Sequence, residues 1–289
     1  MTPHMTPHAN PLIGHRMGLG TWNMGESPLT RDSEIAAIQT GLDLGIRLID
    51  TAEMYAEGGA ERVIAAALKG RPTVARDSLT IVSKVLPSNA SRAGTIRAGE
   101  ASISRMGCDY LDVFLLHWPG RFPLEETLAG MIDLAERGLI RRWGISNFDL
   151  AGWQRWAQVE VALGVAAACA TNQVYYALGA RGVEFDLLPA MLEADQPLMA
   201  YSPLGSGGLL RHAGLGRLAS DLGLGPATLA LRWIAHRRGA LPIPKSSRPA
   251  HVEQNWQAIH QAPPLPKETL AKLDALFPAP MKKMPLAVL

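Results

Sequence analysis

The sequence lacks several features that would each indicate a particular class of protein. It has only two cysteines in 289 residues, Cys108 and Cys169, and they do not form a C-x-x-C pair. No stretch approaches 18 consecutive apolar residues. A disulfide framework, a cysteine-based metal site and a membrane-spanning helix are therefore not expected. We expect a reduced, cytoplasmic protein that holds no metal and has no membrane partner, with Cys169 as a buried free thiol.

The chain also lacks a charge bias. It has 28 Lys and Arg against 26 Asp and Glu, a net charge of +2, and the arginines form no run. Nothing therefore predicts a nucleic-acid partner. What the chain has instead is 47% hydrophobic and 19% charged residues, a composition typical of a globular protein with a substantial core.

Both ends of the sequence differ from its middle. Residues 1–10 contain a repeated Met-Thr-Pro-His and no apolar stretch, so they do not resemble a secretory signal. We expect residues 1–15 to be a leader that is disordered at its start, and the Pro-rich residues 278–289 to be an irregular tail.

Between these ends, short β-branched or apolar runs alternate with longer helical patterns. The expected strands are 17–22, 46–50, 79–84, 111–117, 141–146, 170–173, 198–201 and 241–244. The expected helices are 33–44, 59–68, 93–106, 124–137, 150–163, 184–193, 226–237, 250–259 and 269–277. Boundary signals include N-cap candidates at Asp32 and Ser33, a C-terminal glycine at Gly45 and a helix-opening Pro226.

Eight strand–helix units without a linker predict an α/β fold, a single-domain (β/α)₈ TIM barrel over residues 16–277. The rival is an open, doubly wound sheet, which usually carries G-x-G-x-x-G after its first strand. Here Gly18 and Gly20 keep that spacing, but Asn23 takes the place of the third glycine and no helix begins there. The barrel is therefore favoured.

In such a barrel the reactive groups lie where strands end. Asp50 ends the second expected strand, with Tyr55 in the loop after it, while Lys84 and His117 end the third and fourth. Each alone has an ordinary explanation: a turn cap, a loop aromatic, a solvated strand end or a core histidine. Their joint placement at one rim favours a catalytic set.

The four residue types suit carbonyl reduction. A nearby ammonium, Lys84, favours the phenolate of Tyr55 and so would lower its pKa, which makes the phenol a better acid. Asp50 would keep Lys84 charged and in place. A neutral His117 could donate a hydrogen bond to the substrate oxygen, and hydride addition needs both that polarisation and a proton.

The motifs around these residues resemble those of the aldo-keto reductases, most closely the bacterial aldehyde and methylglyoxal reductases. The matching phrases are GTW at 20–22, LIDTAEMY at 48–55, LLHWP at 115–119, GISNF at 144–148, TNQ at 171–173, AYSPL at 200–204 and IPKS at 243–246. Together they span roughly residues 17–260. The resemblance implies a monomeric oxidoreductase that transfers a hydride from NADPH to a small aldehyde or ketone.

The resemblance also implies binding roles for further residues. Ser146, Asn147 and Gln173 would bind the nicotinamide carboxamide, and Tyr201 would stack on the ring. The pyrophosphate loop would contain Ser202, Leu204 and Ser206, the adenosine-phosphate segment Lys245, Ser246, Arg248 and Asn255, and the substrate pocket Trp22, Met54 and Trp118. One departure is His251, which stands where the family usually has a phosphate-gripping arginine; Arg248 could compensate.

Two alternatives remain open. A barrel hydrolase or isomerase would need a metal cluster or a nucleophile elbow, and GISNF lacks the last glycine of G-x-S-x-G. A cofactor-binding regulatory or non-catalytic protein of the same fold is also compatible with the motifs, although the complete set of four argues against it.

Overall fold

The computed structural model describes residues 9–165 and 168–289, so the expectation for residues 1–8 lies outside the described part. Eight parallel strands form one sheet in the order of the sequence. They are β1 (Leu19–Gly20), β2 (Leu48–Asp50), β3 (Thr80–Val85), β4 (Leu111–Leu116), β5 (Ile140–Ser146), β6 (Cys169–Tyr175), β7 (Leu198–Tyr201) and β8 (Ala240–Pro242).

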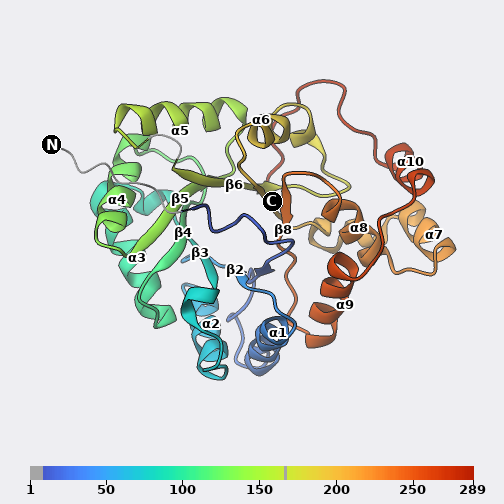
Figure 1. The fold of residues 1–289 in the computed structure, drawn as a ribbon, viewed down its shortest axis with the longest axis horizontal. Helices are drawn as coiled ribbons and strands as arrows, with labels where there is room; N and C mark the ends of the chain where they lie inside the picture. Colours follow the sequence, from blue (N-terminus) through green and yellow to red (C-terminus); the bar gives the residue numbers. More distant parts are fainter. Residues whose placement is uncertain (1–8, 166–167) are drawn as a thin grey trace.

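Helices follow the strands and surround them (Figure 1). They are α1 (Arg31–Asp43), α2 (Gly59–Lys69), α3 (Arg92–Met106), α4 (Leu124–Glu136), α5 (Leu150–Ala162), α6 (Leu187–Glu193), α7 (Ala213–Asp221), α8 (Pro226–Ala235), α9 (Pro249–His260) and α10 (Lys267–Leu276). Helix α7 was not expected, because its glycines and the surrounding loop dilute the apolar pattern.

The sheet closes on itself at β1 and the segment that continues β8. The amide of Gly18 donates to Pro242 O at 3.0 Å, that of Gly20 donates to Pro244 O at 3.1 Å, and Gly20 also forms a parallel bridge with Lys245. The predicted single-domain (β/α)₈ barrel is therefore confirmed.

Residues alternate between the inside of the barrel and the layer under the helices, as the two-residue period of a strand requires. One buried cluster fills the barrel with apolar side chains from six strands or their extensions, together with Leu12. The second, larger cluster lies between the strands and the helices.

Leu12 belongs to the segment that was expected to be a leader, and residues 10–15 of that segment pack against the barrel. Leu12 is 1% exposed and packs against the start of the barrel. Asn10 Nδ2 donates to Ala170 O at 2.9 Å, and Thr80 Oγ1 donates to Pro11 O at 3.2 Å. A short turn, rather than a strand, therefore plugs the amino-terminal end of the barrel.

Helix boundaries follow the predicted signals in part. Gly45 follows α1 with φ of +90°, which a glycine adopts without strain, and Pro226 opens α8. The expected cap of α1 was wrong: the helix begins at Arg31 after Thr30, and Asp32 and Ser33 lie in its first turn. Acidic residues there still complement the helix dipole.

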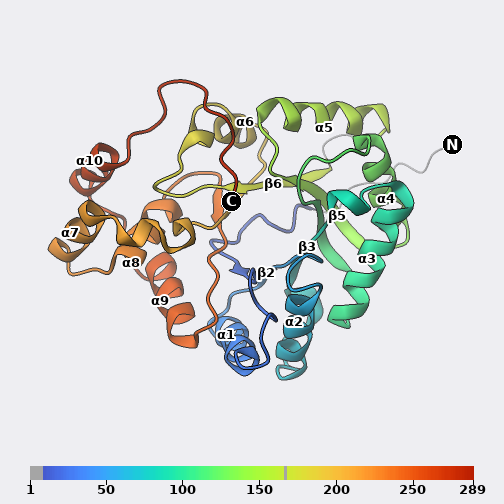
Figure 2. The same ribbon diagram turned by 180° about the vertical axis from the view of Figure 1, so that it is seen from behind.

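The tail, residues 278–289, contains no helix or strand and does not point away from the molecule. It leaves α10, passes beside α6 and returns to the middle of the barrel (Figures 1 and 2). Lys283 lies 3.8 Å from Asp149 and 3.6 Å from Asp186 and so anchors the tail to loops of the barrel. Among the described residues, no helix is long and apolar enough to cross a membrane.

Candidate active site

On three neighbouring strands, the inward position that follows the last apolar residue is titratable. The pairs are Leu48 and Asp50 on β2, Val82 and Lys84 on β3, and Leu115 and His117 at the end of β4. Because inward positions recur every second residue, the same register that fills the barrel with apolar side chains aims these three into its carboxyl end.

Lys84 connects the predicted catalytic residues. Its Nζ donates to Asp50 Oδ2 at 2.9 Å, to Thr51 O at 2.7 Å and to Tyr55 Oη at 3.2 Å. An ammonium has three donors, so all are used. Because Tyr55 Oη accepts from Lys84, the hydroxyl proton of Tyr55 points elsewhere and is available to a group in the cavity.

The pKa of Tyr55 departs from the expected direction. Burial raises it above the ordinary value, and the charge of Asp50 adds to this effect. The Lys84 ammonium opposes them but does not outweigh them. The expected lowering by lysine is thus present as one contribution, whereas the net direction was predicted wrongly, because the sequence does not reveal how completely the hydroxyl is dehydrated.

Burial acts on both members of the Asp50–Lys84 ion pair. It raises the pKa of Asp50, an effect that the Lys84 charge partly offsets. Burial would also lower the pKa of Lys84, but the charge of Asp50, the interaction with Tyr55 and the hydrogen bonds to both residues outweigh it and hold that pKa above the usual range. The lysine therefore stays an ammonium at neutral pH, as expected.

His117 is held as a neutral imidazole. Burial, with the positive charge of Lys84 as a smaller cause, lowers its pKa to about 2. Its Nδ1 is buried and has no hydrogen-bond partner among the described residues. The ring lies edge-on to Tyr55, with 5.8 Å between the ring centres. A neutral histidine beside the phenol can donate one hydrogen bond without bringing a charge.

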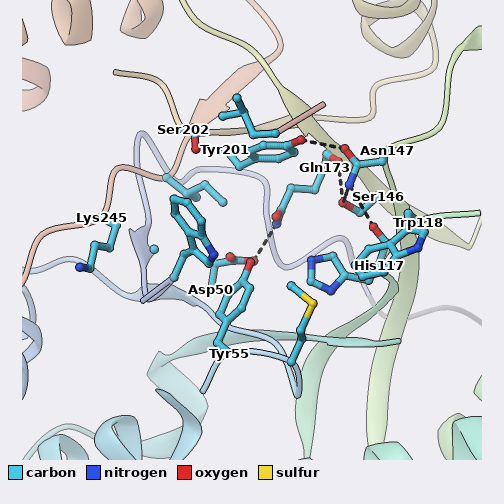
Figure 3. A pocket seen from close by; sticks show the side chains of 15 residues that line it. Asp50, Tyr55, His117, Trp118, Ser146, Asn147, Gln173, Tyr201, Ser202 and Lys245 are labelled. Carbon is cyan, nitrogen blue, oxygen red and sulfur yellow. Dashed lines mark hydrogen bonds between the residues drawn. The ribbon is translucent and has the colours of Figure 1, made fainter. Parts of the chain in front are cut away.

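These side chains face a cavity of about 260 Å³ at the carboxyl end of the barrel (Figure 3). The lining residues are Gly20, Trp22, Asp50, Met54, Tyr55, His117, Trp118, Ser146, Asn147, Gln173, Tyr201, Ser202, Ile243, Lys245 and Leu289. The cavity thus unites three of the four expected catalytic residues, the three expected pocket residues and much of the expected cofactor set. Lys84 lies beneath it.

One wall of the cavity carries hydrogen-bonding groups from β5, β6 and β7. Tyr201 Oη donates to Asn147 Oδ1 at 2.9 Å, and Asn147 Nδ2 donates to His117 O at 3.0 Å. Ser146 Oγ donates to Gln173 O at 2.8 Å. Asn147 has φ of +63°, a left-handed conformation that asparagine tolerates better than most residues. The network fixes the Tyr201 ring as one face of the cavity (Figure 3).

A shift of register aims Gln173 into the barrel. Trp143 pairs with Cys169 and Ile145 pairs with Asn172, so β6 advances one residue further than β5 between the two pairs. Without the extra residue, strict alternation from the inward Ala170 would turn Gln173 outward. The outward Asn172 instead bonds the loop after β5, through Nδ2 to Phe148 O at 2.7 Å.

The remaining predicted cofactor residues do not line the cavity. Leu204 and the exposed Ser206 follow Ser202 in the loop after β7. Beyond Lys245, the amide of Arg248 donates to Ser246 Oγ at 3.1 Å, and Arg248 is exposed at the start of α9. Asn255 is buried within α9. These residues form a surface path that leads away from Lys245, along which His251 is also exposed.

Sequence reasoning missed three lining residues, Gly20, Ile243 and Leu289. A Cβ on Gly20 would lie 2.8 Å from Ile243 O, so only glycine allows this approach of β1 to the segment after β8. The alternation Leu241, Ile243, Lys245 could have revealed Ile243. Leu289 carried no such signal, because it reaches the cavity only through the path of the tail. No group of side chains able to hold a metal ion occurs within residues 9–165 and 168–289.

The chain is similar in sequence to proteins named as reductases. Methylglyoxal reductase YeaE of Escherichia coli is 45% identical over 275 residues, which cover 93% of each chain. The 2,5-diketo-D-gluconic acid reductase B of a Corynebacterium species is 34% identical over 247 residues, 82% of this chain and 81% of that protein.

Solved structures share the fold. An aldo-keto reductase from Klebsiella pneumoniae in complex with NADPH superposes with a TM-score of 0.86 at 44% identity, covering 95% of both chains. The thermostable aldo-keto reductase Tm1743 gives 0.82 at 31% identity, covering 94% of this chain and 100% of that one. The model of the Aldo/keto reductase family matches residues 16–277. The chain therefore belongs to the aldo-keto reductase family.

Proposed function

We propose that the protein reduces small aldehydes or ketones with NADPH and that Tyr55 is the proton donor. One observation carries the proposal: Tyr55 and the neutral His117 face the same cavity as Tyr201, with Lys84 bonded to the phenol from behind. The family membership and the similarity to known reductases support the same conclusion.

The wall of β5, β6 and β7 fits a nicotinamide ring. Tyr201 offers an aromatic face, while Ser146, Asn147 and Gln173 offer the donors and acceptors that a carboxamide needs. Gln173 Oε1 accepts no hydrogen bond from any described residue, so an acceptor is left for a carboxamide N–H. Bound NADPH would supply the hydride; the protein orients the ring and excludes water from the reacting carbon.

Tyr55 and His117 would act on the substrate oxygen. The neutral imidazole donates a hydrogen bond to the carbonyl, which favours the negative charge that develops there. Tyr55 then transfers its proton to that oxygen, and the phenolate that remains is stabilised by the Lys84 ammonium 3.2 Å away. The positive charge behind the phenol thus acts after the proton has left.

The substrate would be a small carbonyl compound such as a 2-oxoaldehyde. Trp22, Met54 and Trp118 make the cavity wall apolar and aromatic, and its volume limits the substrate to a few heavy atoms beyond the nicotinamide. The similarity to a methylglyoxal reductase supports this class.

NADPH should be preferred to NADH because Lys245 and Arg248 can both meet a 2′-phosphate, with Ser246 adding a neutral bond. Burial lowers the pKa of Lys245, and Glu34 opposes this effect. We expect Arg248→Ala to raise KM for NADPH about tenfold and to leave KM for NADH nearly unchanged. Steady-state assays with both cofactors test this. Equal KM values for NADPH and NADH in the wild-type protein would contradict the assignment.

The decisive experiment follows NADPH absorbance with and without methylglyoxal, alongside NADPH binding by tryptophan fluorescence. Oxidation that depends on the carbonyl compound supports the enzyme. Binding without oxidation across a panel of aldehydes and ketones would instead support the regulatory, non-catalytic alternative.

We also propose that the protein acts as a monomer in the reducing cytoplasm. Both cysteines are free, and Cys169 is buried. Elution near 31 kDa in size-exclusion chromatography without reductant is the expected result. A dimer that dithiothreitol dissociates would overturn it.

A further inference from the structure

A hydrogen bond crosses the barrel between two residues that belong to different parts of the site. Gln173 Nε2, from β6, donates to Asp50 Oδ1, from β2, at 2.7 Å (Figure 3). Asp50 is 2% exposed and Gln173 is 1% exposed. No water can therefore easily replace either partner. The bond joins the proposed carboxamide wall to Asp50, which Lys84 connects to the proposed proton donor, Tyr55.

The hydrogen bond between Gln173 and Asp50 can run in only one direction. An ionised carboxylate accepts and cannot donate, and Asp50 uses Oδ2 for Lys84 and Oδ1 for Gln173. Gln173 must therefore present its amide nitrogen to Asp50. The remaining contact of that nitrogen, with Met199 Sδ at 3.8 Å, is weak. Asp50 thus decides which end of the Gln173 amide faces the cavity.

We propose that Asp50 and Gln173 are a positioning pair: Asp50 holds the Gln173 amide with Oε1 toward the nicotinamide carboxamide and so couples cofactor binding to Lys84 and Tyr55. The inference rests on the proposed function and extends it. The hydrogen bonds would run from the carboxamide through Gln173 and Asp50 to Lys84 and Tyr55. One continuous chain of hydrogen bonds would therefore position both the nicotinamide ring and the phenol of Tyr55.

The register of β6 is what makes the contact between Gln173 and Asp50 possible. The extra residue between the Cys169 and Asn172 pairings is what turns Gln173 inward at the level of Ser146. A regular strand would place the side chain of Gln173 under the helices, where Asp50 could not reach it.

The substitution Asp50→Asn tests the orientation directly. The Lys84 ammonium would donate to the amide oxygen of the new asparagine, so the amide nitrogen of that asparagine would point toward Gln173. Two donors would then face each other, so Gln173 has to turn its own oxygen to position 50 and its nitrogen to the cofactor. We therefore expect Asp50→Asn to weaken NADPH binding about tenfold, because the reversed Gln173 amide would present a donor to the donor N–H of the carboxamide.

A double-mutant cycle isolates the pair. Dissociation constants for NADPH are measured by tryptophan fluorescence for wild type, Asp50→Asn, Gln173→Met and the double variant. Gln173→Met should also weaken binding about tenfold, and Asp50→Asn should then add less than twofold. Independent effects that multiply to about a hundredfold, or normal affinity in Asp50→Asn, would overturn the proposal.

Two further measurements keep the outcome interpretable. Ser146→Ala combined with Asp50→Asn is the matched control, because Ser146 Oγ bonds the backbone of Gln173 rather than Asp50; its effects should multiply. Thermal unfolding of the same cycle without cofactor should show that the double variant loses less melting temperature than the sum of the singles. Additive losses would mean that the bond is absent in the free protein.

Binding is read without turnover, so failure of this proposal and failure of the proposed function are separable. A wild-type protein that does not bind NADPH would refute the proposed function. A protein that binds and oxidises NADPH but shows a multiplicative cycle would refute only the positioning pair.

Discussion

At the scale of single residues, replacing Tyr55, the proposed proton donor, is the most direct test of the site. Tyr55→Phe removes only the hydroxyl that Lys84 contacts. We expect kcat to fall by about 10²–10⁴, since general acid catalysis commonly contributes that much, while NADPH affinity stays within about twofold. Tyr110→Phe is the control, because that ring lies between Arg76 and Arg141 outside the cavity, and it should keep its kcat. More than a tenth of wild-type kcat in Tyr55→Phe would exclude the assigned role.

The two charged residues behind the phenol should differ in importance. Lys84→Met should lower kcat as much as Tyr55→Phe, because it removes the ammonium that stabilises the phenolate. At saturating NADPH, Asp50→Asn should lower kcat less than Lys84→Met does, since Thr51 O still accepts from Lys84 at 2.7 Å. Lys84→Met leaves Asp50 buried without its ion-pair partner, which destabilises the protein. Circular dichroism must therefore show that both variants are folded. A larger kcat loss in Asp50→Asn than in Lys84→Met would reverse the roles of the two residues.

The placement of the candidate site residues could be predicted from the sequence more readily than their pKa shifts. Asp50, Lys84 and His117 lie at strand ends, where position in the chain predicts position in space. The net pKa shift of Tyr55 depends on how many atoms surround the hydroxyl, and no local pattern reports that. Leu289 likewise depends on a path that only the folded chain defines.

At the scale of elements, the β5–α5 layer contains a carboxyl group that the proposed reaction does not use. Glu160 on α5 accepts from Trp143 Nε1 on β5 at 2.7 Å, and burial raises its pKa to about 7 despite that bond. Between its ordinary pKa of 4.5 and this value, the folded protein holds a proton that the unfolded chain has lost. The free energy of unfolding should therefore fall as pH rises through this interval and level off above pH 7.

The size of that fall is about 3 kcal/mol for Glu160 alone. Glu160→Gln keeps an acceptor for Trp143 and cannot ionise, so the difference in unfolding free energy between pH 5 and pH 8 should shrink by roughly that amount. Urea denaturation at the two pH values measures it. An unchanged difference would mean that Glu160 is ionised in the folded protein at pH 5.

The number of strands, their order and most helices were predictable because the two-residue and 3.6-residue periods alternate without interruption. Helix α7 was missed because its sequence, with Gly214 and Gly216, has a weak intrinsic preference, and packing of Leu215 and Leu218 decides the outcome. The register shift of β6 was equally invisible, since TNQ reads the same with or without an extra residue.

At the scale of the whole molecule, the segment before β1 closes the amino-terminal end of the barrel. Leu12→Ala would leave a cavity among the apolar residues inside the barrel, and such changes cost about 2–5 kcal/mol. We expect a lower melting temperature with KM and kcat unchanged at 25 °C, because the site lies at the opposite end. Leu29→Ala is the matched control, since Leu29 is 95% exposed. Equal melting temperatures for the two variants would show that residues 10–15 do not plug the barrel.

The barrel closes through hydrogen bonds between β1 and the segment after β8, such as the one from Gly20 to Pro244, and this closure limits when the protein can fold during synthesis. These hydrogen bonds join segments 224 residues apart, so the barrel cannot close until nearly the whole chain has left the ribosome. At about 5–20 residues per second, the amino-terminal strand waits roughly 10 to 45 s for its partner. Throughout that time its edge and the apolar barrel interior remain open to other chains. The nascent protein is therefore most exposed to aggregation, and most dependent on chaperones, just before its last strand emerges.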